Sequence, residues 1–97
     1  MRYSTVLVTS SSYTPTDVDY YIGINFEGSV TITLPENAEN GTCYVIKDEL
    51  GQASQGANRY IEIIPSGEDK IDGMNKATIA IDYGSLTLIY RNGWKVV

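Results

Sequence analysis

The sequence predicts an all-β fold: a compact β-sandwich or flattened barrel of roughly eight to nine short strands, with an extended N-terminal arm. Val, Ile and Thr together number 27, against five Ala and five Leu, and eight Tyr join them. These residue types suit a pleated, half-buried surface. Nine Gly and three Pro are spread along the chain, as turns require. No stretch of about ten residues combines helical apolar spacing with freedom from Gly and Pro, so we expect no substantial helix.

The first 19 residues differ from the rest and are expected to form the arm. Residues 5–9 (TVLVT) are a plausible short strand. Residues 10–16 are small, polar and extended, because Pro15 disfavours helix at the residue before it. The predicted organisation is therefore an arm and lead-in at 1–19 and a single all-β domain at 20–97.

Regular alternation begins at Tyr20. Residues 20–25 alternate, Glu27-Gly28 reads as a tight turn, and residues 29–34 alternate again before Pro35. In the second stretch the apolar residues are expected to point inward and the threonines outward (Val30, Ile32 and Leu34 against Thr31 and Thr33). Residues 42–47 are apolar on both faces, which is typical of a central strand. Residues 52–58 have few apolar side chains and are predicted to be an exposed loop.

Further strands are expected at 60–64, 77–81, 85–90 and 94–97, with a short strand and turn at 70–73. Asn92-Gly93 predicts a type I′ hairpin before the last strand. Residues 31–35 and 62–65 resemble each other at a spacing of about 30, and each segment ends in Pro. A solenoid of two or three coils would produce this echo. Any two strands that are stopped in the same way would produce it too.

Composition excludes several classes of function. The chain has no His and one Cys, so a Ser-His-Asp triad, a Cys-His pair, a His-bearing zinc site and an internal disulfide are excluded within it. The net charge of −5 argues against nucleic acid as a partner, because phosphate contacts need clustered Lys or Arg. No apolar run approaches about 18 residues, and the N-terminus lacks an apolar signal segment. We therefore expect no membrane partner and synthesis in a cytoplasm.

Two patterns could carry chemistry. Asp69, Asp72 and Asn75 offer oxygen ligands that could wrap Ca²⁺, but Asp and Gly are also ordinary turn residues. Pairs among the 12 acidic residues could support glycoside hydrolysis, yet an acid with a raised pKa needs a pocket that a thin domain hardly provides. We favour the structural interpretation of both, and expect no enzyme activity, no metal and no cofactor.

The aromatic residues indicate contacts. The tyrosines could form an interface or a carbohydrate-stacking surface, although Tyr also simply suits strands. Trp94 is expected in the core, and Cys43 is expected to be a small buried residue.

Several segments together resemble the small all-β structural modules of tailed bacteriophages, found in tail fibres, neck appendages and capsid decoration (cement) proteins. The likeness covers about residues 13–97. It is carried by the order and spacing of these segments: residues 20–23 (YYIG), 30–35 (VTITLP), 44–48 (YVIKD) with Gly51, 61–65 (IEIIP), 71–73 (IDG), 83–86 (YGSL) and 92–94 (NGW).

The resemblance implies a virion structural role and brings no catalytic residues with it. A separate chain of this size that starts with Met favours a decoration protein on the outer capsid surface, made in the host cytoplasm. It would bind at capsomer junctions and stabilise the head. The alternative is a tail-fibre or neck-appendage module that binds a cell-surface receptor or glycan.

On the decoration hypothesis, the expected partners are the major capsid protein and further copies of this chain, as a dimer or trimer on a symmetry axis. The arm is expected to add a strand to a neighbouring sheet. The predicted contact residues are Val6, Val8 and Tyr13 in the arm, followed by Tyr3, Tyr60 and Tyr90.

Overall fold

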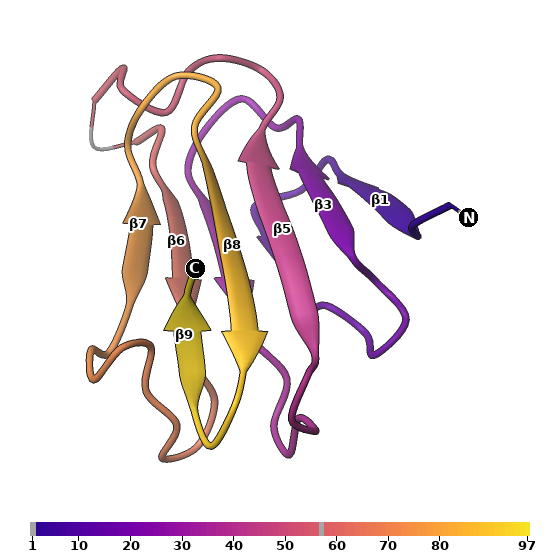
Figure 1. The fold of residues 1–97 in the computed structure, drawn as a ribbon. Coiled ribbons are helices and arrows are strands. Elements are labelled where there is room, and N and C mark those ends of the chain that lie inside the picture. The colour runs from indigo at the N-terminus through magenta and orange to yellow at the C-terminus, as the bar shows by residue number, and fades with distance from the viewer. Residues whose placement is uncertain (1, 57) are drawn as a thin grey trace.

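Two separate sheets form the protein in the computed structural model, which describes residues 2–56 and 58–97 (Figure 1). Sheet A has the strand order β1-β3-β5-β8-β9, and sheet B has the order β2-β4-β6-β7. No helix in the described ranges could cross a membrane. The all-β prediction is confirmed, in the form of the sandwich. The strands are β1 (Thr5–Val8), β2 (Ser12–Tyr13), β3 (Tyr21–Ile24), β4 (Val30–Thr33), β5 (Cys43–Asp48), β6 (Ile61–Ile64), β7 (Ala77–Ile79), β8 (Ser85–Tyr90) and β9 (Trp94–Val96).

The first six strands alternate between the two sheets. β1, β3 and β5 pair in parallel in sheet A, while β2, β4 and β6 pair in parallel in sheet B. This part of the chain therefore winds as three coils. The two similar segments at 31–35 and 62–65 lie side by side in successive coils, with Thr31 opposite Glu62 in the parallel pair of β4 and β6. The last three strands pair antiparallel, β7 with β6, β8 with β5, and β9 with β8. The sandwich thus consists of three solenoid-like parallel coils followed by three strands that pair antiparallel.

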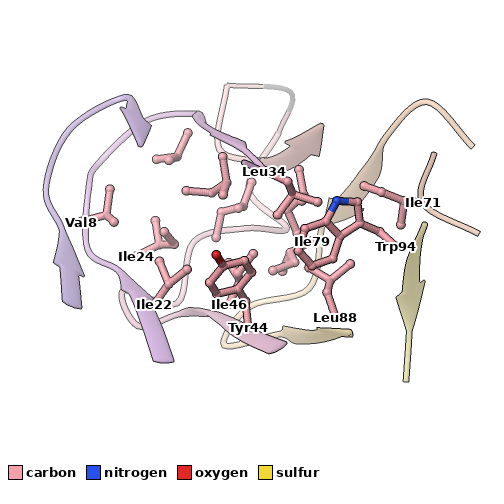
Figure 2. Close-up of a cluster of buried hydrophobic side chains, with 14 of the residues drawn as sticks. Val8, Ile22, Ile24, Leu34, Tyr44, Ile46, Ile71, Ile79, Leu88 and Trp94 are labelled. Atoms are coloured by element: carbon pink, nitrogen blue, oxygen red, sulfur yellow. The ribbon is translucent and has the colours of Figure 1, made fainter. Parts of the chain in front are cut away.

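Apolar side chains from both sheets fill the space between them (Figure 2). Alternation decides which residues enter: in β4, Val30 and Ile32 are buried while the two threonines are half-exposed, as predicted. Burying one such Ile or Val side chain contributes about 1.5–3 kcal/mol to folding. β5 occupies the centre of sheet A, which confirms its prediction as a central strand.

The predicted arm is part of the sandwich. β1 pairs with β3 over four residues and β2 pairs with β4, so residues 5–13 contain the first strand of each sheet. Pro15, which follows them, is buried. The reason is the parallel winding, because an extended segment can form the outermost coil by pairing in parallel with β3 and β4.

The last hairpin differs from its prediction. Tyr90 pairs with Trp94, so the loop contains three residues and not the two of a type I′ turn. Asn92 and Gly93 both have positive φ, at 52° and 119°. The Asn-Gly pair therefore marked the hairpin correctly but not its length.

Trp94 closes the core at the β9 end, as predicted. Its ring stacks on Tyr44 with centroids 5.7 Å apart and meets Tyr90 edge-on at 5.2 Å. The side chain is fully buried, yet its Nε1 has no hydrogen-bond partner among the described residues. A buried donor without a partner costs about 1–3 kcal/mol, so the indole ring is held in place by apolar contacts and not by a hydrogen bond.

We expect Trp94→Phe to be far milder than Trp94→Ala, because Phe removes the unpaired donor and keeps most of the ring contact. Trp94→Ala should lower the free energy of unfolding by about 3–5 kcal/mol. Trp94→Phe should lower it by less than half of that amount. Urea unfolding of both variants followed by circular dichroism measures the difference, and equal losses would contradict this account of the indole.

Candidate functional site

The outer faces of the two sheets differ in chemistry. Sheet B turns mainly polar side chains outward, with Ser12, Thr31, Glu62 and Thr78 in register across it. Sheet A turns apolar and polar side chains outward in about equal number, and the polar ones are Thr5, Lys47, Ser85, Thr87 and Lys95. We call this surface the A face; its apolar residues are Leu7, Tyr21, Cys43, Val45, Ile89 and Val97.

Val45 lies at the centre of the A face. It pairs with Tyr21 of β3 on one side and Thr87 of β8 on the other. All three side chains are half-buried. Charged side chains stand toward the margins, with Lys47 at one end of β5 and Lys95 on β9. An apolar centre with a polar rim is the anatomy of a protein–protein contact surface.

Glu49 lies against the A face beside β3. Its carboxylate occupies the space above Gly23, where a Cβ would overlap it. The Tyr21 hydroxyl donates a hydrogen bond of 2.6 Å to Glu49 Oε2. This bond, together with burial and the Glu49 charge, raises the pKa of Tyr21 to about 12, so the hydroxyl stays a neutral donor. The pair fixes the orientation of the Tyr21 ring on the A face.

The β9 edge of sheet A is closed by a neighbouring segment. Trp94 N donates to Lys70 O at 3.0 Å, and Asp72 N donates to Trp94 O at 2.9 Å. Val96 N donates to Asp72 Oδ2 at 3.2 Å. Because the outward backbone groups of β9 are occupied in this way, this edge offers little to another strand.

The outer edge of β1 is open: among residues 2–56 and 58–97, no strand pairs with it. The carbonyl oxygens of Ser4 and Val8 accept hydrogen bonds from β3 and the residue after it, at 3.0 and 2.9 Å. Alternate residues of a parallel strand face the same neighbour, so Thr5 and Leu7 turn their N–H and C=O groups away from the sheet. Residues 3–16 contain no charged side chain and a single Pro. Free strand edges of proteins usually carry charges that block pairing, so an uncharged edge indicates a covered one.

Asp48 organises the loops at the far end of β5. It is 1% exposed, and its carboxylate accepts five backbone hydrogen bonds of 2.9–3.2 Å, from residues 50, 51, 52, 53 and 83. Burial alone would raise the pKa of Asp48, but the backbone donors outweigh it and hold the pKa below its usual value. We missed this role in the sequence, where the only available signal was an Asp placed just before the Gly51 turn. The neighbouring Lys47 Nζ donates a hydrogen bond of 2.5 Å to Tyr83 O.

The predicted contact residues do not form one surface. The prediction of Val8 as a contact residue is wrong. Its side chain is 3% exposed and belongs to the core of its own chain, because it points between the sheets. Val6 also points inward and is half-buried, and the Tyr13 hydroxyl donates to Asp19 Oδ2 at 2.6 Å.

The three remaining predicted contacts lie apart. Tyr3 is exposed and stacks on Tyr20 near the start of β3, with centroids 4.3 Å apart. Tyr60 precedes β6 and is half-buried, while Tyr90 packs on Trp94 at the β9 side. Sequence reasoning therefore reached the region of β1 but missed Val45 and Ile89, whose shared face only the strand register reveals.

Two of the three residues in the calcium pattern, Asp72 and Asn75, use their side-chain oxygens for other hydrogen bonds. Asp72 Oδ2 accepts from Val96 N, and Asn75 Oδ1 accepts from Lys70 Nζ at 2.5 Å. Among the described residues, no group of three or more Cys, Asp or Glu is placed to hold a metal ion.

An acidic hollow of about 300 Å³ lies beside Asp17, Glu36 and Glu39. Tyr44 forms part of its wall and donates to Thr16 O at 2.9 Å. Burial, followed by the charges of Asp19 and Asp17, raises the pKa of Tyr44 to about 12. Its hydroxyl therefore remains neutral and already paired, so it is not free to act on a ligand.

The A face and the open β1 edge meet at Leu7, which is 53% exposed. Comparison of the sequence with known protein families and with curated proteins found no match. The site is therefore defined by its own geometry: an outer sheet surface with the apolar Val45 at its centre, bounded on one side by the outer edge of β1.

We expect Asp48→Asn to lower the free energy of unfolding by about 2–4 kcal/mol at pH 7, because an amide nitrogen would face backbone donors in a buried site. The folded pKa of Asp48 is lowered, so its contribution is complete above the unfolded value of about 3.9 and is lost as the pH falls below it.

Chemical denaturation between pH 7 and pH 2 measures this effect. The wild type should lose more stability in the acid range than Asp48→Asn does. The exposed Glu68→Gln is the control and should follow the wild type. If Asp48→Asn and Glu68→Gln behave alike at pH 7, the carboxylate does not organise these loops.

Proposed function

We propose that this chain is a structural protein of a tailed-phage particle: a capsid decoration protein that binds the outer surface of the head at capsomer junctions and stabilises it. The observation that carries the proposal is the outer surface of sheet A with the half-buried Val45 at its centre. The order of segments that resembles phage structural modules supports the particle as the setting. The major capsid protein is the partner in this proposal, and the chain performs no chemistry.

The A face suits a flat and static contact. On the inner side of sheet A, fully buried side chains such as Ile22, Ile46 and Leu88 pack its strands into the core. Little conformational freedom is therefore lost on binding. The molecule measures 34 × 33 × 21 Å. A broad face of these dimensions is large enough to bury the roughly 800 Å² per partner of a standard protein interface.

Stabilisation follows from position and copy number. A chain that contacts two capsomers at once adds its binding free energy to their junction, and anything that binds only the assembled state shifts the equilibrium toward it. The net charge of −5 suits the outer surface, away from packaged DNA.

The competing function is a fibre or neck module that binds glycan through exposed tyrosines. The two most exposed, Tyr3 at 64% and Tyr83 at 59%, lie at opposite ends of the sheet A strands. Tyr3 stacks near the start of β3, whereas Tyr83 N bonds Asp48 at the end of β5. The two rings therefore do not make one stacking platform, and the geometry favours the A face.

Immunogold labelling of intact particles of the phage that encodes the chain locates it directly. We expect label over the whole head surface in many copies. Label confined to the tail tip or neck would replace the decoration proposal with the fibre or appendage function. Particles without label anywhere would refute a virion role.

A charge at the centre of the A face should abolish attachment. Purified Val45→Lys is expected to bind at least tenfold more weakly than the wild type to heads that lack the protein, measured by co-sedimentation. Thr31→Lys is the matched control, because it places the same side chain at a half-buried position on the outer face of sheet B. Thermal unfolding confirms that both variants are folded, and equal binding by both would remove the A face as the contact surface.

A further inference from the structure

We infer that two copies of this chain pair through β1, antiparallel and across a two-fold axis, so that their A sheets become one continuous sheet. The inference goes beyond the proposed function, because it concerns the free protein and needs no head. It rests on the open β1 edge, the closed β9 edge and the absence of charge along residues 3–16.

The backbone groups of β1 are self-complementary. In an antiparallel pair, hydrogen-bonded residues exchange two bonds, and both residues must turn their N–H and C=O groups outward. Thr5 and Leu7 do so. When Thr5 of one copy faces Leu7 of the other, the two-fold axis repeats the pair, and two pairs of two hydrogen bonds join the strands.

This register centres on Val6. It keeps both bonding residues inside the strand Thr5–Val8, whereas a register centred on Leu7 would need Thr9, which lies beyond it. Val6 then faces Val6 of the second copy at a position without hydrogen bonds, where Cα atoms of antiparallel strands come within about 4.5 Å.

Side chains on both faces of β1 fit the pairing. Val6 points inward and is half-buried beside Val8, which marks this end of the core (Figure 2). Contact between the two Val6 side chains covers their remaining exposed surface. On the outer side, Leu7 lies next to Thr5 of the second copy, so the A face continues across the axis.

A second copy is the occupant that the edge fits best. Each chain carries a net charge of −5, but the edge itself has no charge, so two copies can approach there without local repulsion. Because the β9 edge of sheet A is occupied by residues 70–72, β1 cannot pair head-to-tail with it. Pairing of β1 with β1 therefore closes at two copies and does not grow into a filament.

Disulfide trapping tests both the contact and its register. Val6→Cys and Leu7→Cys are each made in a Cys43→Ser background, which removes the only native thiol. Across the axis, the two Cα atoms at position 6 fall within the range of a disulfide, while those at position 7 are about 8 Å apart and outside it. Under mild oxidation, Val6→Cys should form a covalent dimer at least tenfold faster than Leu7→Cys, although Leu7 is the more exposed residue.

Analytical ultracentrifugation gives an independent measurement. The wild type should show a concentration-dependent dimer, and Leu7→Pro should be monomeric, since Pro removes an outward N–H and obstructs the edge. If Leu7→Pro does not fold, the cysteine comparison decides. A wild type that stays monomeric up to about 100 times the concentration used for trapping overturns the inference, and so does faster cross-linking of Leu7→Cys. Val45 is not at this edge, so loss of head attachment by Val45→Lys leaves the trapping result unchanged.

Discussion

The buried carboxylate of Asp48 is the constraint on which the arrangement of the two sheets depends. β5 is the last parallel strand of sheet A, and beyond it the chain must cross to sheet B and later return. Asp48 bonds the outgoing backbone at residues 50–53 and the returning backbone at Tyr83, which precedes β8. A single ionised group thus joins both crossings at one point. With its pKa lowered by those donors, the charge persists at any neutral or mildly acidic pH.

The return beside β5 is what creates the A face. Because β8 pairs antiparallel with β5, Val45 acquires Thr87 as a neighbour opposite Tyr21, and the outward apolar residues of three strands become contiguous. The three preceding coils place no strand on that side of β5. The surface that we propose to contact the head therefore depends on the antiparallel ending of the chain.

The two outer edges of sheet A differ in how far neighbouring segments cover them. At the C-terminal side, β7, β8 and β9 turn back, and the segment around Ile71 covers the edge of β9. At the N-terminal side, none of the described residues covers the first coil in this way, and β1 is the outermost strand of sheet A (Figure 1). An edge that is neither charged nor covered is free to pair with another chain, and this asymmetry links the proposed pairing to the proposed attachment. Two copies joined at β1 would present two adjoining A faces to the surface below.

Local chemistry was sufficient to predict most of the strands. Alternation assigned Val30 and Ile32 to the core, two-sided apolarity made β5 central, and turn residues bounded β8 and β9. These features depend on side chains a few positions apart, so they are visible in the sequence. The three-residue loop before Trp94 was not, because loop length follows from the register that the flanking strands adopt.

Composition and alternation by themselves determined that this protein is all-β with an apolar interior, and they left a sandwich, a flattened barrel and a short solenoid open. Only the tertiary structure decided that residues 5–13 are edge strands of two sheets, that Val8 is internal, and that Asp48 holds two distant loops. The physical reason is range. Burial preference and turn geometry act within a few residues, whereas parallel pairing joins segments 16–31 positions apart and leaves no local trace of which strand lies beside which.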